Sequence, residues 1–484
     1  MDSRWLFIGG AVLAATFAFI YLGAVPKDIG NASSKHLIIG VISARDHFLQ
    51  RDAIRRTWGS QISKLPNSEL LFMVGDDDCP YHPDDRISPY DCDEWKVLSK
   101  DFENSGLKRF FNSDLHERRT LVECYVGIGF KIFHPVLLMS VSVSKEFLLR
   151  VGNCTLVLVD AEEVLEEVKV DPKSCSDKSE KSAFCDIKLA NPLFLPRQFE
   201  GELRVLSDGI GESDLCGQNF FSFQLKENWV CDWVDTSVIH FKYLRSVRDS
   251  LVTWSGKSCP LLSAVYSIVD RDVLKKHVES KLKRSLEWKE HLDFVLKKIA
   301  IEQVVHRDLL VLPHQDIYST LPQKVMLVLR RLTQDFDFKF MMKVDDDTFV
   351  NISSLKILLD TEADSRPKIW SRFHHHRSVP LYGKWADIKY SSLTYPSFPS
   401  GAGYLMTGSL AQVLAQAGPY MTSYAGEDVS MGIWISSTVN NATLIDVPCW
   451  LPRSECQETV LVSQLSPIDM LEMWKENEYY LESL

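Results

Sequence analysis

Apolar and polar positions near the beginning of the chain follow the pattern of strands that alternate with a helix. The unbroken apolar run "HLIIGVISA" (residues 36–44) predicts a buried strand, and "QRDAIRRTW" (residues 50–58) has the spacing of an amphipathic helix. A second apolar run, "ELLFMVG" (residues 69–75), predicts another buried strand. A strand, a helix and a strand in this order are typical of a parallel sheet. The sequence therefore predicts a βαβ unit in residues 36–75.

The pattern changes between residues 76 and 258. Short runs of alternating hydrophobicity, such as "CTLVLVDAEEVLEEVKV" and "FEGELRVLSD", are separated by Gly, Pro and the polar stretch "KSCSDKSEKS". Alternation bounded by turn residues is typical of half-buried strands. We expect a mainly β domain, residues 76–258, inserted into the α/β fold. The pattern is compatible both with a carbohydrate-binding β-sandwich and with a spacer.

The helical period returns over residues 273–305, where the lysines are typical of a solvated helix face. A strand ("DLLVLP"), a helix ("PQKVMLVLRRLTQDF") and a buried strand ("FKFMMKV", residues 338–344) follow. With 484 residues, of which 45% are hydrophobic, the chain has enough apolar side chains for more than one core. We expect two domains: an α/β domain from residues 36–75 and 259–484, and the insert.

An uncharged apolar stretch lies close to the N-terminus. Residues 6–25, "LFIGGAVLAATFAFIYLGAV", are long enough to cross a bilayer as a helix, and Arg4 precedes them. We interpret this stretch as a signal anchor with residues 1–5 in the cytosol and residues 26–35 as a short stem. The alternative is a cleaved signal peptide, whose apolar core is usually shorter. Both interpretations direct the rest of the chain into the secretory lumen.

The charge, the cysteine content and the glycosylation tripeptides agree with a location in the secretory lumen. The formal net charge of -11 comes without any long basic block, which argues against a nucleic-acid partner. The eleven cysteines are compatible with several disulfides and one leftover thiol, and proximity alone suggests the pairs Cys449–Cys456 and Cys175–Cys185. Four Asn-x-Ser/Thr tripeptides are glycosylation acceptors by pattern, at Asn31, Asn153, Asn351 and Asn441.

Three consecutive carboxylates, Asp345, Asp346 and Asp347, directly follow the strand predicted for residues 338–344. Ligands of open α/β sheets bind beyond the carboxyl ends of the strands. Because side chains alternate in an extended segment, we expect Asp345 and Asp347 to face one way while Asp346 turns toward the protein. Oxygen ligands at this spacing suit Mg²⁺ or Mn²⁺, with further positions left for diphosphate oxygens. The alternative is an acidic turn that caps a helix beginning near Asn351.

A second acidic pair, Glu427 and Asp428, stands at the predicted start of a helix in "YAGEDVSMGIW". Negative charge is stabilised at a helix N-terminus, so capping alone also explains the pair. Upstream, "YPSFPSGAGYLMTG" contains Gly401 and Gly403, which let the backbone approach a ligand closely. Two glycines at this spacing are weak evidence by themselves.

Together these segments resemble glycosyltransferase family 31, the β-1,3-galactosyl, N-acetylglucosaminyl and N-acetylgalactosaminyl transferases. The matching segments are "RDAIRRTW", "KVDDDTFVN", "YPSFPSGAGY" and "GEDVSMG", and four motifs in family order are far more specific than any one. The resemblance covers about residues 36–75 and 285–484. It implies a GT-A fold, a Rossmann-like α/β architecture, here interrupted by a mainly β insert and preceded by one transmembrane helix.

The resemblance also implies a role for each matching residue. Asp347, helped by Asp345, would hold Mn²⁺ or Mg²⁺ against the diphosphate of a UDP-sugar, and Asp428 corresponds to the catalytic base. Arg51 and Arg55 would contact the nucleotide end. The same comparison assigns to the donor site Lys343, Asp346, Gly401, Gly403, Glu427 and Trp385. Trp385 either stacks on a sugar or is a core residue.

One departure from the pattern concerns the metal. Many GT-A enzymes take a further metal ligand from a histidine late in the chain, but here no histidine follows His376. The histidine run 374–376 is one possible substitute, and water with diphosphate is another.

Within the family, the likeness is greatest to a subgroup that carries a similar insert, including "NCTLVLVDAEE" and "LPRQFEGELRV". This likeness implies an inverting enzyme that transfers GalNAc from UDP-GalNAc to a terminal β-GlcNAc of a glycoprotein glycan of the O-mannose type. It also implies a single-pass type II protein of the Golgi or endoplasmic reticulum membrane. The alternatives are a β-1,3-galactosyltransferase with another acceptor and a catalytically silent partner or chaperone of a transferase.

Overall fold

The structure, a computed structural model, describes residues 34–98, 106–115, 125–160, 163–175, 184–207, 229–233, 238–246, 251–252, 261–362, 366–380, 384–387, 389–439 and 441–482. The predicted anchor, residues 6–25, lies outside these ranges. Within them, every helix is too short or too polar to cross a bilayer.

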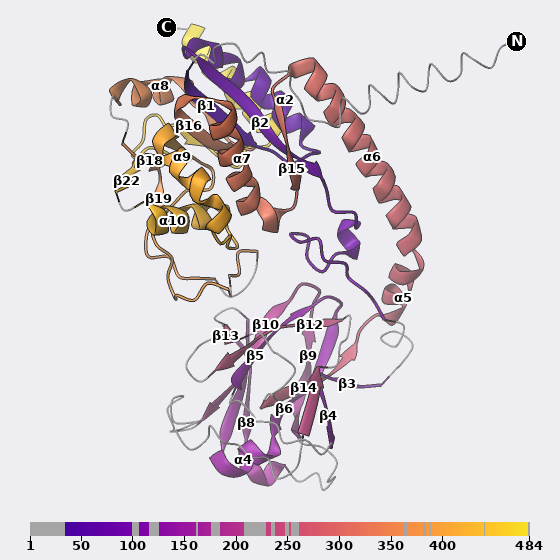
Figure 1. Ribbon diagram of the computed structural model, residues 1–484. Helices are drawn as coiled ribbons and strands as arrows, with labels where there is room; N and C mark the ends of the chain where they lie inside the picture. The colour runs from indigo at the N-terminus through magenta and orange to yellow at the C-terminus, as the bar shows by residue number, and fades with distance from the viewer. Residues whose placement is uncertain are drawn as a thin grey trace, which may run out of the picture.

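A seven-stranded sheet forms the centre of the α/β domain (Figure 1). Its order is β15 (Leu309–Gln315), β2 (Ser68–Asp77), β1 (Lys35–Ile42), β16 (Phe338–Asp345), β21 (Gly403–Thr407), β18 (Lys368–Ser371) and β22 (Thr443–Asp446). Only β21 among them runs antiparallel to its neighbours. Strand β1 pairs with β2 on one side and β16 on the other, so the strand order reverses there and the sheet has its switch point between β1 and β16. The predicted mixed α/β fold is confirmed.

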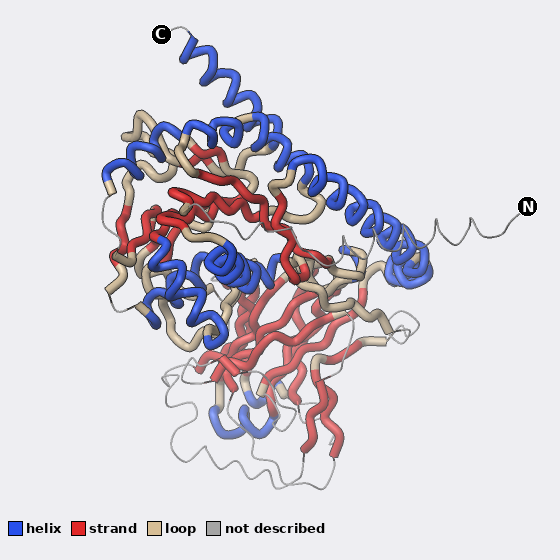
Figure 2. Tube along the Cα trace, turned by 45° about the horizontal axis from the view of Figure 1, so that its top comes forward, coloured by secondary structure: helices blue, strands red, loops and turns tan. Residues whose placement is uncertain are grey.

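Helices cover both faces of this sheet (Figure 2). In β1, Leu37, Ile39 and Val41 pack into one core, while Ile38 and Ile42 pack into another. The first core is completed by α2 (Phe48–Arg56), α6 (Lys281–His306), α8 (Ile352–Thr361) and α11 (Pro467–Glu482), and the second by α7 (Leu321–Asp335), α9 (Gly408–Ala417) and α10 (Glu427–Thr438). Burial on both faces explains the unbroken apolar runs in the sequence.

The helical segment 273–305 is divided in two. Helix α5 (Arg271–Glu279) ends at Ser280, and α6 begins at the next residue. The Ser280 hydroxyl donates to Lys276 O at 2.8 Å, and a serine that bonds to the backbone in this way competes with regular helical hydrogen bonding. The resulting α6 is long, and it extends from the α/β domain toward the insert (Figure 1).

The insert is a β-sandwich. One sheet has the order β13-β12-β5-β10-β7-β8 and the other β3-β14-β6-β9, and side chains from both sheets form one shared core. The strands of this region among the described residues, with the α-helix α4 (Lys145–Val151), are β3 (Lys108–Arg109), β4 (Phe111–Leu115), β5 (Tyr125–Ile132), β6 (Val136–Ser144), β7 (Cys154–Asp160), β8 (Glu163–Val170), β9 (Phe184–Leu195), β10 (Glu200–Ser207), β11 (Trp229–Trp233), β12 (Ile239–Ser246), β13 (Leu251–Val252) and β14 (Leu262–Ile268). Strand β14 pairs with β6, so the insert extends to Ile268. The boundary expected at residue 258 is therefore about ten residues early, because a buried apolar strand looks the same in either domain.

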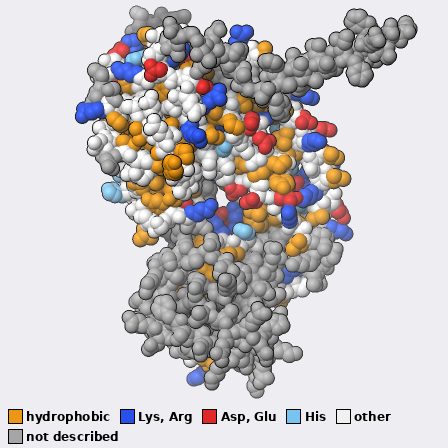
Figure 3. Space-filling model, viewed as in Figure 1, with side chains coloured by type: hydrophobic (Ala, Val, Ile, Leu, Met, Phe, Trp, Pro, Cys, Tyr) orange, Lys and Arg blue, Asp and Glu red, His pale blue; other side chains and the backbone are white. Residues whose placement is uncertain are grey.

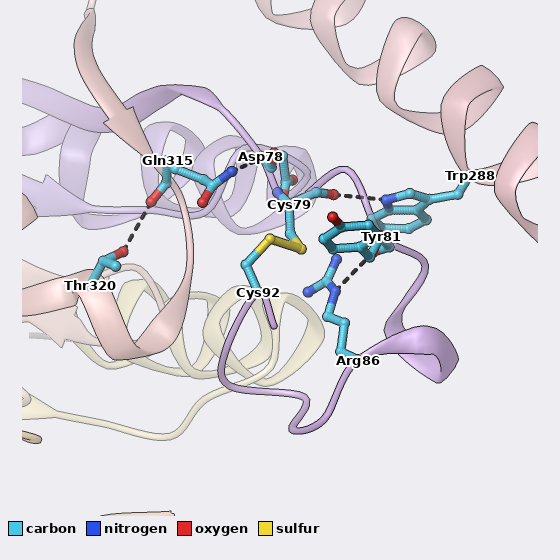
Figure 4. The surroundings of a disulfide bond; sticks show 8 residues. All are labelled: Asp78, Cys79, Tyr81, Arg86, Cys92, Trp288, Gln315 and Thr320. Atoms are coloured by element: carbon cyan, nitrogen blue, oxygen red, sulfur yellow. Dashed lines mark hydrogen bonds between the residues drawn. A yellow bond between two sulfur atoms is a disulfide. The ribbon is translucent and has the colours of Figure 1, made fainter. Parts of the chain in front are cut away.

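A disulfide-closed loop leads from the α/β domain into the insert (Figure 4). The bond joins Cys79 to Cys92. Trp288 of α6 donates from Nε1 to Cys79 O at 2.9 Å, and Arg86 lies over the Trp288 ring at 5.4 Å. The loop is thus fixed to α6. Both cysteine pairs expected from proximity, Cys175–Cys185 and Cys449–Cys456, are confirmed.

Candidate functional site

Lys343 forms the centre of the candidate site. It stands two residues before Asp345 in β16, so both side chains leave the strand on the same face. Lys343 is 1% exposed, and its Nζ lies 2.8 Å from Asp345 Oδ1, donates to Gly401 O at 2.5 Å and forms an ion pair with Glu427. One buried ammonium group therefore joins the end of β16, the loop before β21 and the start of α10.

Asp428 lies beside this lysine. A Cβ atom placed on Gly401 would be 3.5 Å from Asp428 Oδ2, so the carboxylate stands against the glycine whose carbonyl binds Lys343. A Cβ on Gly426 would be only 2.6 Å from Asp428 Oδ1, which explains why a residue without a side chain precedes the acidic pair. Val429 N donates to Asp428 Oδ1 at 2.8 Å. The two acidic motifs, far apart in the sequence, thus converge on one site.

Asp345 and Asp347 are half-buried, and the residue between them is buried. Burial raises the pKa of Asp345, and the charge of Asp347 adds to this effect against the opposing charge of Lys343. Burial also raises the pKa of Asp347, followed by the charge of Asp346. The carboxylates therefore repel one another at the end of β16, and a bound cation would relieve this repulsion. The residues fit a divalent ion with oxygen ligands.

Asp346 turns into the protein, as expected from the sequence, but the backbone there is a turn and not an extended segment: β16 ends at Asp345, and Thr348 N donates to Asp345 O at 3.2 Å. It is 8% exposed, and its Oδ2 lies 2.9 Å from Nδ1 of His47, directly before α2. The hydrogen bond to Asp346 is the main cause that raises the pKa of His47. His47 was not singled out from the sequence, because its partner lies 299 residues away.

Glu427 completes the buried part of the site. Burial, reinforced by the charges of Asp345 and Asp428, raises the pKa of Glu427 to about 7, while the charge of Lys343 opposes the shift. The Tyr404 hydroxyl donates to Glu427 Oε2 at 3.2 Å. Burial opposes the charged form of Lys343, but Asp345 and Glu427 outweigh it and hold the pKa of Lys343 above its usual value. Gly403 lies close by, and a Cβ there would be 2.8 Å from Lys343 O.

Arg51 and Arg55 lie in a buried ion-pair network. Arg51 is 0% exposed and binds Glu302 through Nε and Nη2, while its remaining bonds go to Ser43 Oγ, Ala44 O and Arg45 O. All five N–H donors of its guanidinium group thus meet protein acceptors. The expected contact of Arg51 with a nucleotide is not supported by these bonds. Arg51 instead holds the loop that follows β1 at the switch point of the sheet.

Arg55 extends the same network. Its Nε and Nη2 donate to the two carboxylate oxygens of Asp308 at 2.7 and 2.8 Å, and its Nη1 lies 2.7 Å from Glu302 Oε1. The guanidinium carbon also lies 4.7 Å above the Phe72 ring. These contacts tie α2 to α6 and β15, and a nucleotide contact by Arg55 stays a prediction.

The loop after β1 contains a residue that the sequence reasoning missed. Arg45 is 5% exposed, and its Nη1 donates to Gly75 O at 2.7 Å, which joins the carboxyl ends of β1 and β2. Its Nε is buried without a hydrogen-bond partner among the described residues. Lys324 of α7 donates to Ser43 O at 2.8 Å and fixes the other side of the loop. A buried donor without a partner in a loop at the carboxyl ends of β1 and β2 is a candidate contact for an anionic ligand.

Trp385 lies at the surface. It is 60% exposed, which excludes the core alternative, and its Nε1 donates to the Tyr318 hydroxyl at 3.1 Å. Tyr318 belongs to a short 3₁₀ turn, η5 (Tyr318–Thr320). Burial raises the pKa of Tyr318, and the charges of Asp428, Asp345 and Glu427 raise it further. Tyr318 and Trp385 therefore stand next to the acidic site with aromatic surface available to a ligand.

The histidine run does not complete a metal site with the aspartates. No group of three or more His, Cys, Asp or Glu side chains suited to a metal occurs within the ranges that the structure describes. The rings of His374 and Phe398 are tilted, with centroids 5.2 Å apart, and His375 Nδ1 lies 2.7 Å from Ser397 Oγ. These contacts give no support to the histidine run as the substitute ligand, and the other option, water with diphosphate, stays a prediction.

The four glycosylation tripeptides differ in their surroundings. Asn153 and Asn441 are exposed, and Asn31 lies outside the described residues. Asn351 is half-buried, and its Oδ1 accepts from Ser354 N at 3.1 Å as the N-cap of α8. The helix that begins after the aspartates is thus capped by Asn351 and not by the acidic residues.

Comparison with known proteins identifies related chains. Residues 289–441 match the family model described as Galactosyltransferase. The chain is 26% identical over 463 residues to UDP-GalNAc:beta-1,3-N-acetylgalactosaminyltransferase 2 of Homo sapiens, an alignment that covers 91% of this chain and 87% of that protein. The protein of the same name from Xenopus laevis is also 26% identical, over 92% of this chain and 90% of its own length.

A second kind of relative matches a shorter part. Beta-1,3-galactosyltransferase 6 of Mus musculus is 30% identical over 144 residues, which cover 29% of this chain and 44% of that protein. The family resemblance noted from the four motifs is confirmed. The full-length alignments to the first two relatives include the insert, and all three relatives support a β-1,3-glycosyltransferase.

Proposed function

We propose that this chain, a relative of the β-1,3-glycosyltransferases with a galactosyltransferase-type domain, transfers N-acetylgalactosamine from UDP-GalNAc to the 3-hydroxyl of a terminal β-linked GlcNAc on a glycoprotein glycan. The donor in this proposal is the one for which the relatives that align over most of the chain are named. The acceptor, a glycan of the O-mannose type, follows from the family resemblance alone.

The observation that carries the proposal is the convergence of the two acidic motifs on Lys343. Asp345 and Glu427 bind the same ammonium group, and Asp428 stands against Gly401, which binds it as well. A metal-binding carboxylate and a general base must both lie close to the donor phosphate and the anomeric carbon. This convergence supports the proposal, because β16 ends at the switch point of the sheet, where ligands of such folds bind.

In this proposal the reaction is a single nucleophilic substitution at the anomeric carbon of the donor sugar. Asp428 accepts the proton from the acceptor 3-hydroxyl while the oxygen attacks the anomeric carbon from the face opposite the diphosphate. The bond from carbon to the diphosphate oxygen breaks, and UDP leaves with the electron pair. The product is inverted from the α-linked donor to a β linkage. General-base action of this kind contributes roughly 10²–10⁴-fold.

Asp345 and Asp347 would hold a divalent cation, Mn²⁺ or Mg²⁺, together with water and diphosphate oxygens. When bound, the cation offsets the negative charge that grows on the leaving diphosphate. Lys343 keeps Asp345 oriented, and Arg51 holds the loop after β1 that contains Arg45. The partnerless Nε of Arg45 supports an anionic ligand here. By the family resemblance, the enzyme would be a type II membrane protein of the Golgi or endoplasmic reticulum.

Transfer from three donors, UDP-GalNAc, UDP-Gal and UDP-GlcNAc, to a β-GlcNAc glycoside tests the proposal. We expect transfer from UDP-GalNAc and a β-1,3 linkage in the product by NMR. Preference for UDP-Gal would favour the second candidate, a β-1,3-galactosyltransferase, which the likeness to the mouse galactosyltransferase supports. Absence of transfer from every donor would contradict both and leave the alternative of a catalytically silent partner.

A further inference from the structure

A cleft of about 870 Å³ separates the α/β domain from the insert. Both domains contribute walls. The α/β side supplies residues from the disulfide-closed loop, from η5 and from the segments around residues 384–386 and 425, and the insert supplies residues from β5, β7, β10 and β12. Figure 3 shows acidic, basic and histidine side chains gathered along the boundary where the two parts meet.

The wall on the α/β side is aromatic and fixed. The rings of Tyr90 and Tyr318 lie 5.5 Å apart, and Lys384 Nζ stands 3.9 Å from the centroid of the Tyr318 ring. Ser319 N donates to Tyr90 O at 3.0 Å, and the Cys79–Cys92 bond closes the loop that carries Tyr90 (Figure 4). Aromatic faces held in this way present apolar surface against which the C–H face of a sugar ring can stack.

The insert wall carries a charged group of three residues. Glu200 lies between two lysines, with Oε1 2.8 Å from Lys131 Nζ and Oε2 2.8 Å from Lys242 Nζ. Lys131 pairs with Glu200 across the β5–β10 ladder, so the group belongs to the rigid sheet. An ammonium group has three N–H donors, and one carboxylate contact leaves others for a ligand. The group of three carries a net positive charge at the edge of the cleft.

Two residues that line the cleft, Ala425 and Tyr318, lie near the acidic site, and the charges of Asp428 and Asp345 act on Tyr318. Ala425, which lines the cleft, lies three residues before Asp428. Tyr318 also lines it and receives the hydrogen bond from Trp385. A sugar whose hydroxyl reaches Asp428 would therefore have its remaining glycan chain directed past Tyr318 and into the space between the domains.

We propose that this cleft is the acceptor subsite of the enzyme. It binds the inner sugars of an oligosaccharide acceptor, with Tyr90, Tyr318 and Trp385 against the sugar rings and Lys131 and Lys242 of the insert as hydrogen-bond donors to the glycan. The insert then selects oligosaccharide acceptors over a single sugar. This inference rests on the proposed function and assigns a role to the domain that the family's four motifs do not include.

The dimensions and chemistry of the cleft favour a glycan over a protein partner. Pockets of roughly 300–1,000 Å³ suit small molecules, whereas stable protein interfaces bury about 800 Å² on each partner. Sites at domain interfaces with apolar walls and a few placed polar groups are typical of small-molecule binding. The cleft has both features, and its volume is in the upper part of this range, which suits more than one sugar.

The test compares two acceptors with the same terminal sugar: methyl β-GlcNAc, and a glycopeptide whose O-mannose-linked glycan ends in β-GlcNAc. For the full chain we expect a higher kcat/KM with the glycopeptide. Lys242→Met removes the ammonium group, keeps most of the unbranched side chain and leaves the Lys131–Glu200 pair intact. It should lower the ratio of the two kcat/KM values about tenfold, as expected for one lost charge-assisted hydrogen bond. Tyr90→Ala should lower the same ratio through the opposite wall.

Two controls separate the outcomes. Lys188→Met replaces an exposed lysine of β9, in the other sheet of the insert, and should leave the ratio unchanged. Hydrolysis of the UDP-sugar in the absence of acceptor should be the same in all variants. Equal kcat/KM values for both acceptors in the unmodified chain, or a ratio that neither Lys242→Met nor Tyr90→Ala changes, would overturn the inference while the proposed function stands.

Binding of the glycopeptide, measured by saturation-transfer NMR, tests the cleft even if the proposed function fails. If no UDP-sugar is transferred, binding that Lys242→Met weakens would support the cleft as a glycan site while the proposed function fails. Absence of glycopeptide binding to the unmodified chain in this measurement would overturn the inference.

Discussion

At the scale of single residues, the buried Lys343 holds together the segments that form the site. Three acceptors surround its ammonium group, so the cost of burying a charge is offset by direct partners. Asp345, Glu427 and Asp428 repel one another, and Lys343 reduces that repulsion. Burial disfavours the charged form of Asp345 and Glu427, and the charge of Lys343 offsets part of this cost; a bound divalent cation would offset more of it.

Asp347→Asn tests the cation. The change removes one of two proposed carboxylate ligands and leaves the Lys343–Asp345 pair intact, so we expect the transfer rate at saturating Mn²⁺ to fall on the order of 100-fold, because metal catalysis supplies several kcal/mol. The measurement is the initial transfer rate as a function of free Mn²⁺. Asp360→Asn, an exposed aspartate of α8, is the matched control. Full turnover of the unmodified chain in excess chelator would be incompatible with the role of Asp345 and Asp347.

The pattern of apolar and polar residues was sufficient to predict the burial of residues whose position depends only on their own segment of the chain. The structure shows the expected burial of Asp346 between two half-buried aspartates, although residues 346–347 form a turn and not the extended backbone from which this was predicted. The network of Arg51 was beyond such reasoning, since its partner Glu302 lies 251 residues further along the chain. His47 and Arg45 were missed for the same reason. Tertiary packing determines which residues are their partners, and the hydrophobic periodicity of the sequence carries no information on such contacts.

At the scale of elements, α2 and α6 are joined by the Arg51–Glu302–Arg55 network. Burial opposes the charge of Glu302, but its bonds to Arg51 and Arg55 outweigh burial and hold its pKa below the ordinary value of 4.5. A carboxyl group with a depressed pKa in the folded state contributes stability above its unfolded pKa, and that contribution disappears as the pH falls through the folded value. The network should therefore stabilise the loop after β1 at neutral pH and lose this effect in acid.

Glu302→Gln makes this dependence measurable. At pH 7 the change leaves two buried arginines with one partner fewer, and we expect a loss of about 3 kcal/mol in the free energy of unfolding of the α/β domain. The difference between variant and unmodified chain should shrink as the pH is lowered below about 4.5, where the Glu302 carboxylate of the unmodified chain becomes protonated. Chemical denaturation across this pH range measures it. A difference that stays constant with pH would contradict the assigned ion pairs.

Whether a segment is a helix or a strand was predictable where a single hydrophobic period extended over the whole segment. The strands β1, β2, β15 and β16 and the helices α2 and α7 lie where the apolar pattern predicts them, within a few residues at each end. The single helix expected over residues 273–305 divides at Ser280, where the bond of one hydroxyl to the backbone interrupts a continuous period. Sheet order and the sharing of strands between domains depend on long-range pairing and were not predictable.

At the scale of the whole molecule, the chain consists of two units with separate cores. The sandwich of the insert has its own hydrophobic cluster, and the seven-stranded sheet has two others, one on each face. The long helix α6 and the disulfide-closed loop connect them. Cores that are separate in this way can unfold separately, because the contacts within each exceed those between them.

Scanning calorimetry should therefore resolve two transitions. A ligand that binds only the folded α/β domain raises the stability of that domain alone, by about 2.7 kcal/mol at a concentration 100 times its Kd. We expect UDP with Mn²⁺ to shift one transition and leave the other in place. Equal shifts of both transitions, or a single transition throughout, would show that the two units do not unfold independently and that the donor site is not confined to the sheet.

The most direct test of the central claim is Asp428→Asn, measured twice. Isothermal titration of UDP in the presence of Mn²⁺ should give a Kd within about twofold of the unmodified chain, since Asp428 is assigned no bond to the nucleotide, and Asp360→Asn again serves as the control. Single-turnover transfer to the acceptor should fall roughly 10²–10⁴-fold. Near-normal transfer by Asp428→Asn would contradict the assignment of this carboxylate as the base and, with it, the active site built around Lys343.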